Sequence, residues 1–276
     1  MYRDLARYYD LIYSWKDYER EASELKKLFS EYKRSAGARL LDVACGTGLH
    51  IKHLRDEYSC TGIDVNEEIL EVARANVKGM EFIRADMTSF NLGMKFDVVT
   101  CLFSSIGYVR TYRNLRKTFQ NFAGHLVEGG AAFVEPWFTK EVYDVGRPSM
   151  TTFDGEDVKI ARLNTSEIQG DLSIMEMHYL VAERGKGVRH YVDRHELGLF
   201  EVDETLKIME ESGLESQFKS EGLMPGRGLY IGIKKKIPFF STYSFLHLDL
   251  MHGCDQDLEW CRELGCRDSA DIGEIH

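Results

Sequence analysis

Apolar and polar positions alternate with two periods along the first half of the chain. Short apolar runs typical of buried strands alternate with amphipathic segments of helical period. The predicted strands are 38–44, 60–65, 80–86, 96–106 and 130–137, and the predicted helices are 18–32, 48–58, 66–77 and 113–126. Strands that alternate with helices form a parallel sheet. We therefore expect an open, doubly wound α/β fold that binds ligands beyond the carboxyl ends of its strands.

The pattern changes to a period of two between about residues 150 and 200. Three segments, 158–169, 173–183 and 188–200, are separated by glycine-containing turn signals. They predict an antiparallel layer over the ligand-binding edge of the main sheet. A helix over 202–213 follows, and strands 214–221 and 227–235 complete a mostly parallel, seven-stranded sheet as a hairpin.

The last forty residues differ from the rest of the chain. Residues 237–276 begin with an apolar and aromatic stretch and then become acidic, with two arginines against eight Asp and Glu. We therefore expect one domain over 1–236, with an insertion at about 150–200, and a C-terminal extension over 237–276. No role can be assigned to that extension from its sequence.

Charge and hydropathy narrow the function classes. The 276-residue chain has a net charge of −10, which argues against nucleic acid as a partner because phosphates are held mainly by Lys and Arg. No run of eighteen apolar residues is present to cross a membrane, and the tyrosine-rich, charged start does not resemble a signal peptide. We expect a cytoplasmic protein.

The cysteines do not predict a metal site. Cys254, Cys261 and Cys266 lie near one another, but their spacing matches no paired-cysteine zinc pattern. The other three cysteines, at 45, 60 and 101, fall in or next to predicted buried strands. Free thiols are therefore expected throughout.

A glycine turn carries the strongest local signal. The sequence 42–48, DVACGTG, follows an apolar strand directly and precedes a helix. Small residues at Ala44, Gly46 and Gly48 suit a backbone that turns sharply beneath a ligand. Ile51 stands where the dinucleotide pattern G-x-G-x-x-G needs its third glycine, which weakens a pyrophosphate-binding interpretation.

Two acidic residues end the next strands. Asp64 closes the second strand, where a carboxylate can accept hydrogen bonds from both ribose hydroxyls, and Asp86 closes the third, where it can accept one from an adenine amino group. Each feature alone is also typical of an ordinary loop or helix cap. Together with the glycine turn they resemble the class I S-adenosylmethionine-dependent methyltransferases.

That resemblance implies a cofactor, S-adenosylmethionine, and a product, S-adenosylhomocysteine. It implies that the glycine turn approaches the methionine portion and the ribose, and that strand four ends beside the sulfonium. The implied cofactor-binding residues are Tyr18, Ala44, Gly46, Gly48, Asp64, Val65, Asp86, Met87 and Leu102.

Longer segments resemble a narrower family. Strand four continues LFSSIGYV rather than Asn-Pro-Pro-Tyr, which counts against nucleic-acid and protein-amide substrates. The segments YYDLIY, LLDVACGTG, FSSIGYVRT, FVEPWF, GKGVRHY and GRGLYIGI resemble the N,N-dimethyltransferases of nucleotide-linked 3-amino sugars. The likeness covers 1–236 and excludes the extension.

The narrower resemblance implies an acceptor site. Tyr13 would hydrogen-bond the sugar amine, and His125 would help to remove its proton. Further substrate-binding residues implied by it are Glu135, Trp137, Lys186, Arg189, His190 and Arg227. The last four would give a nucleotide diphosphate its positive partners. Ordinary alternatives stay open: a dipole-favoured histidine at a helix C-terminus for His125, packing for Tyr13, and a solvated turn for Lys186.

The function expected is therefore methyl transfer from S-adenosylmethionine to the amino group of a thymidine-diphosphate-linked deoxysugar. The expected partner is this small molecule, and self-association as a homodimer is compatible with the sequence. Two alternatives stay open: a methyltransferase for another small amine or hydroxyl acceptor, and a noncatalytic adenosyl-ligand sensor or scaffold that docks partners through residues 237–276.

Overall fold

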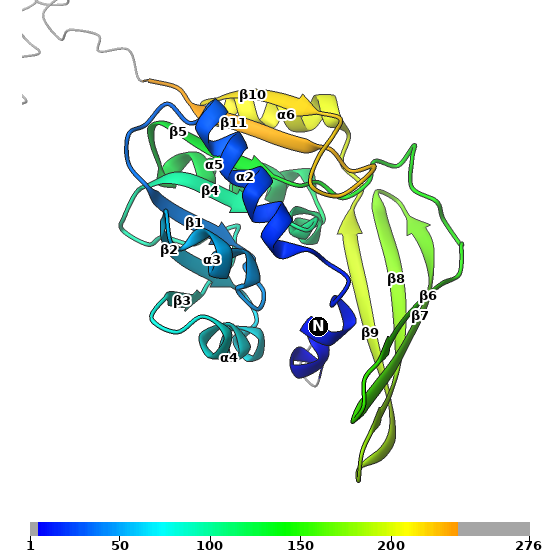
Figure 1. Ribbon diagram of the computed structural model, residues 1–276. Helices are drawn as coiled ribbons and strands as arrows, with labels where there is room; N and C mark the ends of the chain where they lie inside the picture. The colour runs from blue at the N-terminus through cyan, green and yellow to red at the C-terminus, as the bar shows by residue number, and fades with distance from the viewer. Residues whose placement is uncertain (1–4, 237–276) are drawn as a thin grey trace, which may run out of the picture. The chain divides into compact units, whose positions relative to one another are not determined.

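The computed structural model describes residues 5–236, which contain a seven-stranded sheet of order β10-β11-β5-β4-β1-β2-β3 (Figure 1). Its strands are β1 (Arg39–Val43), β2 (Ser59–Asp64), β3 (Glu81–Arg84), β4 (Phe96–Cys101), β5 (Leu126–Val134), β10 (Leu214–Lys219) and β11 (Leu229–Lys234). β1 to β5 are parallel, whereas β11 is antiparallel to β5 and β10. The order reverses between β1 and β4. In open sheets of this kind, ligands bind outside the carboxyl ends at that point.

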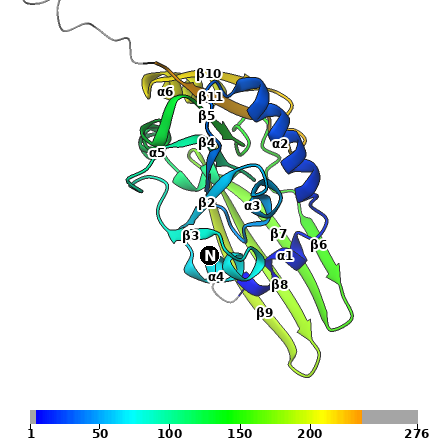
Figure 2. The same ribbon diagram turned by 60° about the vertical axis from the view of Figure 1, so that its left-hand side comes forward.

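Helices cover both faces of this sheet (Figure 2). They are α2 (Tyr18–Tyr32), α3 (Leu49–Leu54), α4 (Glu67–Asn76), α5 (Tyr112–His125) and α6 (Val202–Glu211). Successive strand residues point to opposite faces, so Leu40 packs in the cluster containing α2 and α3 while Leu41 packs in the cluster containing α5 and α6. This two-sided burial explains why the parallel strands are continuously apolar.

A second, four-stranded antiparallel sheet is inserted between β5 and α6. Its strands, in spatial order, are β6 (Ser149–Asp154), β7 (Val158–Gln169), β8 (Leu172–Glu183) and β9 (Gly187–Gly198). One face is buried and carries Met175, Met177 and Tyr179 of β8. The opposite face carries exposed side chains such as Leu163, Leu180 and Val192, which accounts for the period of two in the sequence.

The N-terminal segment joins the two sheets. It contains η1 (Ala6–Tyr8) and α1 (Tyr9–Ile12), whose apolar residues pack in one cluster with the buried face of β6–β9 (Figures 1 and 2). Asp10 accepts hydrogen bonds from Thr47 Oγ1 at 2.6 Å and from Asn76 Nδ2 at 3.0 Å. The segment is thereby attached to the glycine turn and to α4.

The predicted doubly wound fold with an inserted antiparallel layer is confirmed, with local differences. The predicted strand 96–106 ends at Cys101, and η2 (Ser105–Val109) forms in its place because Phe103 and Ser104 adopt positive φ angles of 52° and 62°. The helix predicted over 48–58 ends at Leu54. The inserted sheet has an additional strand, β6, that the three alternating segments did not indicate.

Two further observations concern the part of the chain that the structure describes. Within 5–236 no helix combines the length and the apolar character needed to span a bilayer. Over the same residues, no three His, Cys, Asp or Glu side chains are grouped as metal ligands. Cys45, Cys60 and Cys101 are buried free thiols, whereas the clustered cysteines and the rest of 237–276 lie outside the described residues.

Candidate active site

A cavity of about 1030 Å³ lies where the carboxyl ends of the central strands meet the buried face of the inserted sheet. One part is lined by residues at or just after the ends of β1, β2 and β3, namely Ala44, Gly46, Asp64, Val65, Asp86 and Met87. The other part is lined by residues from distant segments, which include Tyr13, Tyr108, Trp137, Arg162, His195 and Arg227. We call these the cofactor half and the acceptor half of the cavity.

The glycine turn shapes the cofactor half by its backbone. Ala44 and Gly46 have positive φ angles of 55° and 56°, and a Cβ added to Gly46 would meet no atom within 4 Å. A ligand can therefore approach this backbone closely. Gly48 serves another purpose: it is the N-cap of α3, with φ 76°, and an added Cβ would lie 2.9 Å from the Phe82 ring. Gly48 is not among the residues that line the cavity, and its expected ligand contact stays a prediction.

Asp64 links the glycine turn to the end of β2. Its Oδ2 accepts the Gly46 N–H at 3.1 Å, and its Oδ1 accepts the Asn66 N–H at 2.9 Å. Burial raises the pKa of Asp64, and these backbone hydrogen bonds oppose the rise. Asp64 also lines the cavity, where its carboxylate is within the space open to a ligand.

Asp86 and Met87 follow β3 at the far end of the cofactor half. The Oδ1 of Asp86 accepts the N–H and the hydroxyl of Thr88, each at 2.8 Å. The structure thus brings the glycine turn and both strand-ending aspartates to a single cavity. Tyr18 and Leu102 do not line this cavity but a recess of about 30 Å³, which also includes Ala44, Gly46 and His50.

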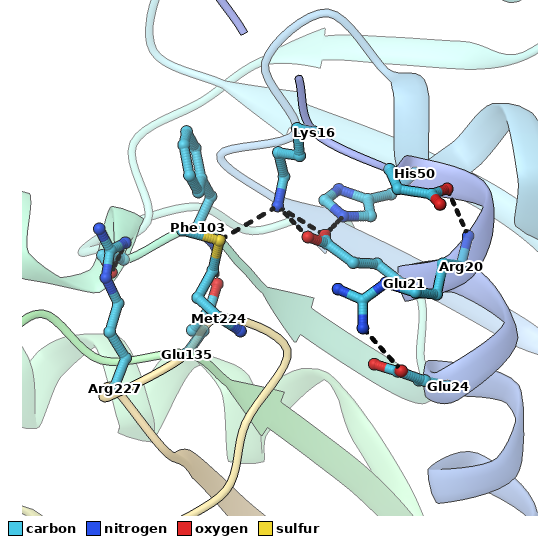
Figure 3. A network of polar contacts seen from close by, with 11 residues as sticks. Lys16, Arg20, Glu21, Glu24, His50, Phe103, Glu135, Met224 and Arg227 are labelled. Carbon is cyan, nitrogen blue, oxygen red and sulfur yellow. Dashed lines mark hydrogen bonds and ion pairs between the residues drawn. The ribbon is translucent and has the colours of Figure 1, made fainter. Parts of the chain in front are cut away.

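A strained turn after β4 contributes to the lining of the cavity. Positive φ angles are costly for bulky residues, and Phe103 and Ser104 both have them. Glu135 holds the turn: its Oε2 accepts the Phe103 N–H at 2.6 Å, and its Oε1 accepts the Met224 N–H at 2.9 Å. Figure 3 shows Glu135 beneath this turn. Burial raises the pKa of Glu135, and the positive charges of Lys16 and Arg227 oppose the rise.

Glu135 therefore does not line the acceptor pocket, as the resemblance had implied. It is fully buried, and both carboxylate oxygens are used to join β5 to two other segments. Its position below the strained turn makes it a support for the cavity floor. This corrects the expected role in contacting the substrate.

Arg227 brings positive charge into the acceptor half. Its Nη1 donates to Ser104 Oγ at 2.7 Å, and its guanidinium lies 4.8 Å from the centroid of the Trp137 ring. Burial lowers the pKa of Arg227, while the negative charge of Glu135 opposes that change. Trp137 is itself fixed by an Nε1–H donated to Ser173 Oγ at 2.8 Å.

Tyr13 also faces the acceptor half. Its hydroxyl accepts a hydrogen bond from Arg162 Nη1 of β7 at 2.9 Å, and its ring packs edge-on against Phe103 with centroids 5.1 Å apart. Tyr13 is thus both packed and directed at the cavity. The two interpretations left open by the sequence are compatible.

A buried charge network supports the segment that carries Tyr13 and Tyr18 (Figure 3). Glu21 Oε2 accepts from Lys16 Nζ at 2.6 Å and lies 2.8 Å from His50 Nε2. Hydrogen bonds and positive charge from His50 and Lys16 hold the pKa of Glu21 below its ordinary value, although burial alone would raise it. The network joins the start of α2 to α3, the helix that follows the glycine turn. No sequence motif indicated it.

His125 lies away from the cavity. Its Nε2 accepts the Leu92 N–H at 3.2 Å, its Nδ1 lies 2.8 Å from the Asn121 carbonyl, and its ring packs on Phe90. It ends α5, on the face of the sheet covered by α5 and α6. The placement favours the alternative of a histidine at a helix C-terminus over the expected catalytic role.

Lys186, Arg189 and His190 are also absent from the cavity lining. They lie at the exposed tip of the β8–β9 hairpin, where Lys186 pairs with Glu183 and His190 stacks on His178. At about 3.3 Å per residue, Arg189 lies about 20 Å along β9 from His195, which does line the cavity. The expected diphosphate contacts of these three residues are therefore not supported.

Arg162, Tyr108 and His195 line the cavity although sequence reasoning did not single them out. The sequence pattern could have indicated His195, because this residue alternates with Asp193 and Leu197 on the buried face of β9. The same segment contains His190, and the histidine that reaches the cavity depends on the register of the strand.

Comparisons with known proteins agree with this geometry. Residues 40–130 match the model of a methyltransferase domain. The chain is 38% identical over 233 residues to the dTDP-3-amino-3,4,6-trideoxy-alpha-D-glucopyranose N,N-dimethyltransferase of Streptomyces venezuelae, covering 83% of this chain and 98% of that one. It is 37% identical over 235 residues to the dTDP-4-amino-2,3,4,6-tetradeoxy-D-glucose N,N-dimethyltransferase of Saccharopolyspora spinosa, covering 84% and 93%.

A solved structure gives the same result. The SAM-bound amino pentose methyltransferase CalS10 of Micromonospora echinaspora superposes with a TM-score of 0.72 at 30% identity, covering 80% of this chain and 92% of that one. Fold, cavity and domain match together define a class I methyltransferase that uses S-adenosylmethionine. Within this class, the chain belongs to the family of nucleotide-linked amino-sugar N,N-dimethyltransferases.

Proposed function

We propose that the protein methylates the amino group of a thymidine-diphosphate-linked amino deoxysugar, first once and then a second time. The similarity to relatives with this activity carries the proposal, because it extends over 98% and 93% of their length. It therefore includes the acceptor half as well as the cofactor half. The cationic Arg227 in a chain of net charge −10 supports an anionic acceptor.

The cofactor half fits S-adenosylmethionine. Gly46 leaves open space beside its backbone, and Asp64 lines the same cavity. In our proposal Asp64 accepts hydrogen bonds from the ribose hydroxyls, Val65 and Met87 contact the adenine, and Asp86 accepts from its amino group. The recess beside Tyr18 and Leu102 is proposed for the methionine end. When bound, the cofactor supplies a methyl group activated by a sulfonium.

The acceptor half fits a nucleotide sugar. A guanidinium has five N–H donors arranged for phosphate oxygens, and Arg227 uses one of them on Ser104. We assign Arg227 to the diphosphate and Trp137 to the wall of the pocket. Tyr13, oriented by Arg162, is assigned to the amine. The cavity of about 1030 Å³ is at the upper end of small-molecule sites, as two ligands require.

The residues contribute mainly by positioning. Methyl transfer needs an amine lone pair in line with the methyl carbon, and holding two reactants in that geometry lowers the barrier by several kcal/mol. The strained turn at Phe103 and Ser104 lines the cavity, and in our proposal its support by Glu135 helps to hold the two reactants in place.

Turnover of nucleotide sugars tests this proposal. Purified protein with S-adenosylmethionine is offered dTDP-linked 3-amino and 4-amino deoxysugars, with sarcosine as an unrelated amine, and products are followed by mass spectrometry. We expect mass increases of one and then two methyl groups on a nucleotide sugar. Methylation of sarcosine without methylation of any nucleotide sugar would overturn the proposed acceptor.

Three earlier expectations stay predictions. They are the cytoplasmic location, the homodimer, and the division into a body at 1–236 and an extension at 237–276. The extension lies outside the described residues.

A further inference from the structure

Trp15 presents an exposed indole in the wall of the cavity. It lines the cavity and is nevertheless 56% exposed, although a large aromatic side chain gains free energy when its surface is removed from water. Trp137 lines the same cavity, but its ring is already in contact with the guanidinium of Arg227 at 4.8 Å. Trp15 therefore offers apolar surface that a ligand in this cavity can cover.

The turn that carries Trp15 is anchored at both ends. The Lys16 N–H donates to the Tyr13 carbonyl at 2.9 Å, so that Ser14 and Trp15 lie at the centre of the turn. Tyr13 and Lys16 are buried. Arg162 of β7 donates to the Tyr13 hydroxyl at 2.9 Å, and Lys16 donates to Glu21 at 2.6 Å. A ring on a supported turn loses little conformational freedom when a flat ligand binds to it.

The contacts of Trp15 place it in the acceptor half. Its ring centroid lies 6.3 Å from that of Tyr13, whose ring packs edge-on against Phe103 at 5.1 Å. The guanidinium of Arg227 lies 5.7 Å from the centroid of the Phe103 ring. A continuous series of contacts thus connects Trp15 to the arginine that we assign to the diphosphate.

Polar groups suited to the edge of a nucleobase lie on the neighbouring strands. Asn164 of β7 lines the cavity together with Ser149, its cross-strand partner on β6. Asn164 follows Arg162 by two residues and therefore shares its face of the sheet, about 7 Å farther along the strand. An amide side chain both donates and accepts hydrogen bonds, as the edge of a pyrimidine also does.

We propose that Trp15 is the stacking platform for the pyrimidine base of the acceptor nucleotide and that Asn164 hydrogen-bonds the edge of that base. The inference deepens the proposed function and rests on it, since it requires a nucleotide-linked acceptor. Every base has a π-face that can stack on an aromatic side chain. The adenine of the cofactor is assigned to Val65, Asp86 and Met87, so the two bases occupy different halves of the cavity.

The affinity for dTDP tests this subsite without turnover. In calorimetry on protein saturated with S-adenosylhomocysteine, Trp15→Ala should raise the dissociation constant of dTDP about 5- to 150-fold, the range for a base stacked on an aromatic side chain. Trp15→Phe keeps a smaller ring and should bind dTDP more tightly than Trp15→Ala. Asn164→Ala should raise the same constant about 2- to 10-fold, as expected for a neutral hydrogen bond.

Ligands that lack the pyrimidine separate stacking from general damage. Trp15→Ala should leave the inhibition constant of pyrophosphate and the affinity for S-adenosylhomocysteine unchanged. With a dTDP-linked amino deoxysugar, KM should rise while kcat changes less than about twofold, because the base is bound equally in the ground and transition states. Val142→Ala, at an exposed residue outside the cavity lining, is the matched control and should behave as wild type.

Three results would overturn the subsite alone. They are unchanged dTDP affinity in Trp15→Ala, an equal loss of affinity for pyrophosphate, and a loss of affinity for S-adenosylhomocysteine as large as that for dTDP, which would place the cofactor adenine on this ring. The proposed function would stand in each case, since it is judged by wild-type turnover. A wild-type protein that neither binds dTDP nor methylates a dTDP-linked sugar would overturn both.

Tryptophan fluorescence gives an independent readout. The chain has three tryptophans, at positions 15, 137 and 260. We expect dTDP to quench the fluorescence of the wild-type protein and to quench that of Trp15→Phe clearly less. Equal fractional quenching in the two proteins would contradict stacking on Trp15.

Discussion

The two halves of the cavity are built in different ways. The cofactor half is formed by residues 43–88, which follow three successive parallel strands, and much of its shape is backbone. The acceptor half collects single side chains from residue 13 to residue 227. The first half depends on local turns, whereas the second depends on tertiary packing around one strained turn. Disturbing the packing should therefore affect acceptor binding more than cofactor binding.

The largest expected effect tests the support of that turn. Glu135→Ala leaves the N–H groups of Phe103 and Met224 without their buried acceptor, and each unsatisfied group costs about 1–3 kcal/mol. We expect the free energy of unfolding, measured in urea, to fall by about 2–6 kcal/mol. The affinity for the acceptor should fall more than the affinity for the cofactor. Glu215→Ala, at an exposed pair with Arg34, is the control and should not move the unfolding midpoint. An equal loss of both affinities would contradict the proposed difference between the cofactor half and the acceptor half.

The next effect concerns the buried charge network below the N-terminal segment. Glu21→Gln weakens hydrogen bonds to charged partners, which are worth about 1.5–3 kcal/mol. The pKa of Glu21 is lower in the folded protein than its unfolded value near 4.5. Ionised Glu21 therefore contributes its full stabilisation above pH 4.5, and this stabilisation is lost as the pH falls through the folded-state pKa. Melting temperatures of wild type and variant should converge on acidification. A gap that widens toward acid would contradict the assigned charge.

The third prediction concerns the affinity of the cofactor half for its ligand. Asp64→Ala should weaken binding of S-adenosylhomocysteine by about 1–3 kcal/mol, roughly 5- to 150-fold, because two ribose hydroxyls lose their acceptor. Calorimetry measures this directly. Asp171→Ala, at an exposed surface pair, is the matched control. Unchanged affinity in Asp64→Ala would remove the ribose assignment.

Arg227→Lys probes the acceptor half without removing its charge. Lysine lacks the forked donors of arginine, so we expect the KM for the nucleotide sugar to rise on the order of tenfold. The affinity for S-adenosylhomocysteine should stay the same. A rise in cofactor dissociation constant of equal size would show that Arg227 does not belong to the acceptor half alone.

The smallest effect tests the corrected position of the hairpin tip. Arg189→Ala should change the KM for the nucleotide sugar by less than about twofold, because surface substitutions distant from a site usually contribute under about 0.5 kcal/mol. A tenfold increase in this KM would show that the hairpin tip does contribute to the substrate site.

The same contrast explains what could be predicted from the sequence. Ala44, Gly46, Asp64 and Asp86 were predictable because each follows a periodic strand, and parallel strands end at one edge of a sheet. The chain periodicity likewise predicted the helices and most of the strands. The strained turn at Phe103 was not predictable, since its geometry depends on Glu135 more than thirty residues away in the chain.

The acceptor half was harder to predict from the sequence, for a physical reason. Resemblance placed positive charge near residues 186–190, but the register of a twelve-residue strand decides which end meets the cavity. His195 reaches the cavity and Arg189 does not. His125 shows the same limit, because a histidine near the end of a helix can face either the site or the core. Its hydrogen bonds to Leu92 and Asn121 lie in the core.

The most direct test of the central claim is a crystal structure with S-adenosylhomocysteine and a dTDP-linked amino sugar bound together. The account predicts the ribose at Asp64, the adenine beside Asp86, the diphosphate at Arg227, and the sugar amine facing the sulfur past the Phe103 turn. Adenosyl density outside the residues that follow β1, β2 and β3 would contradict it.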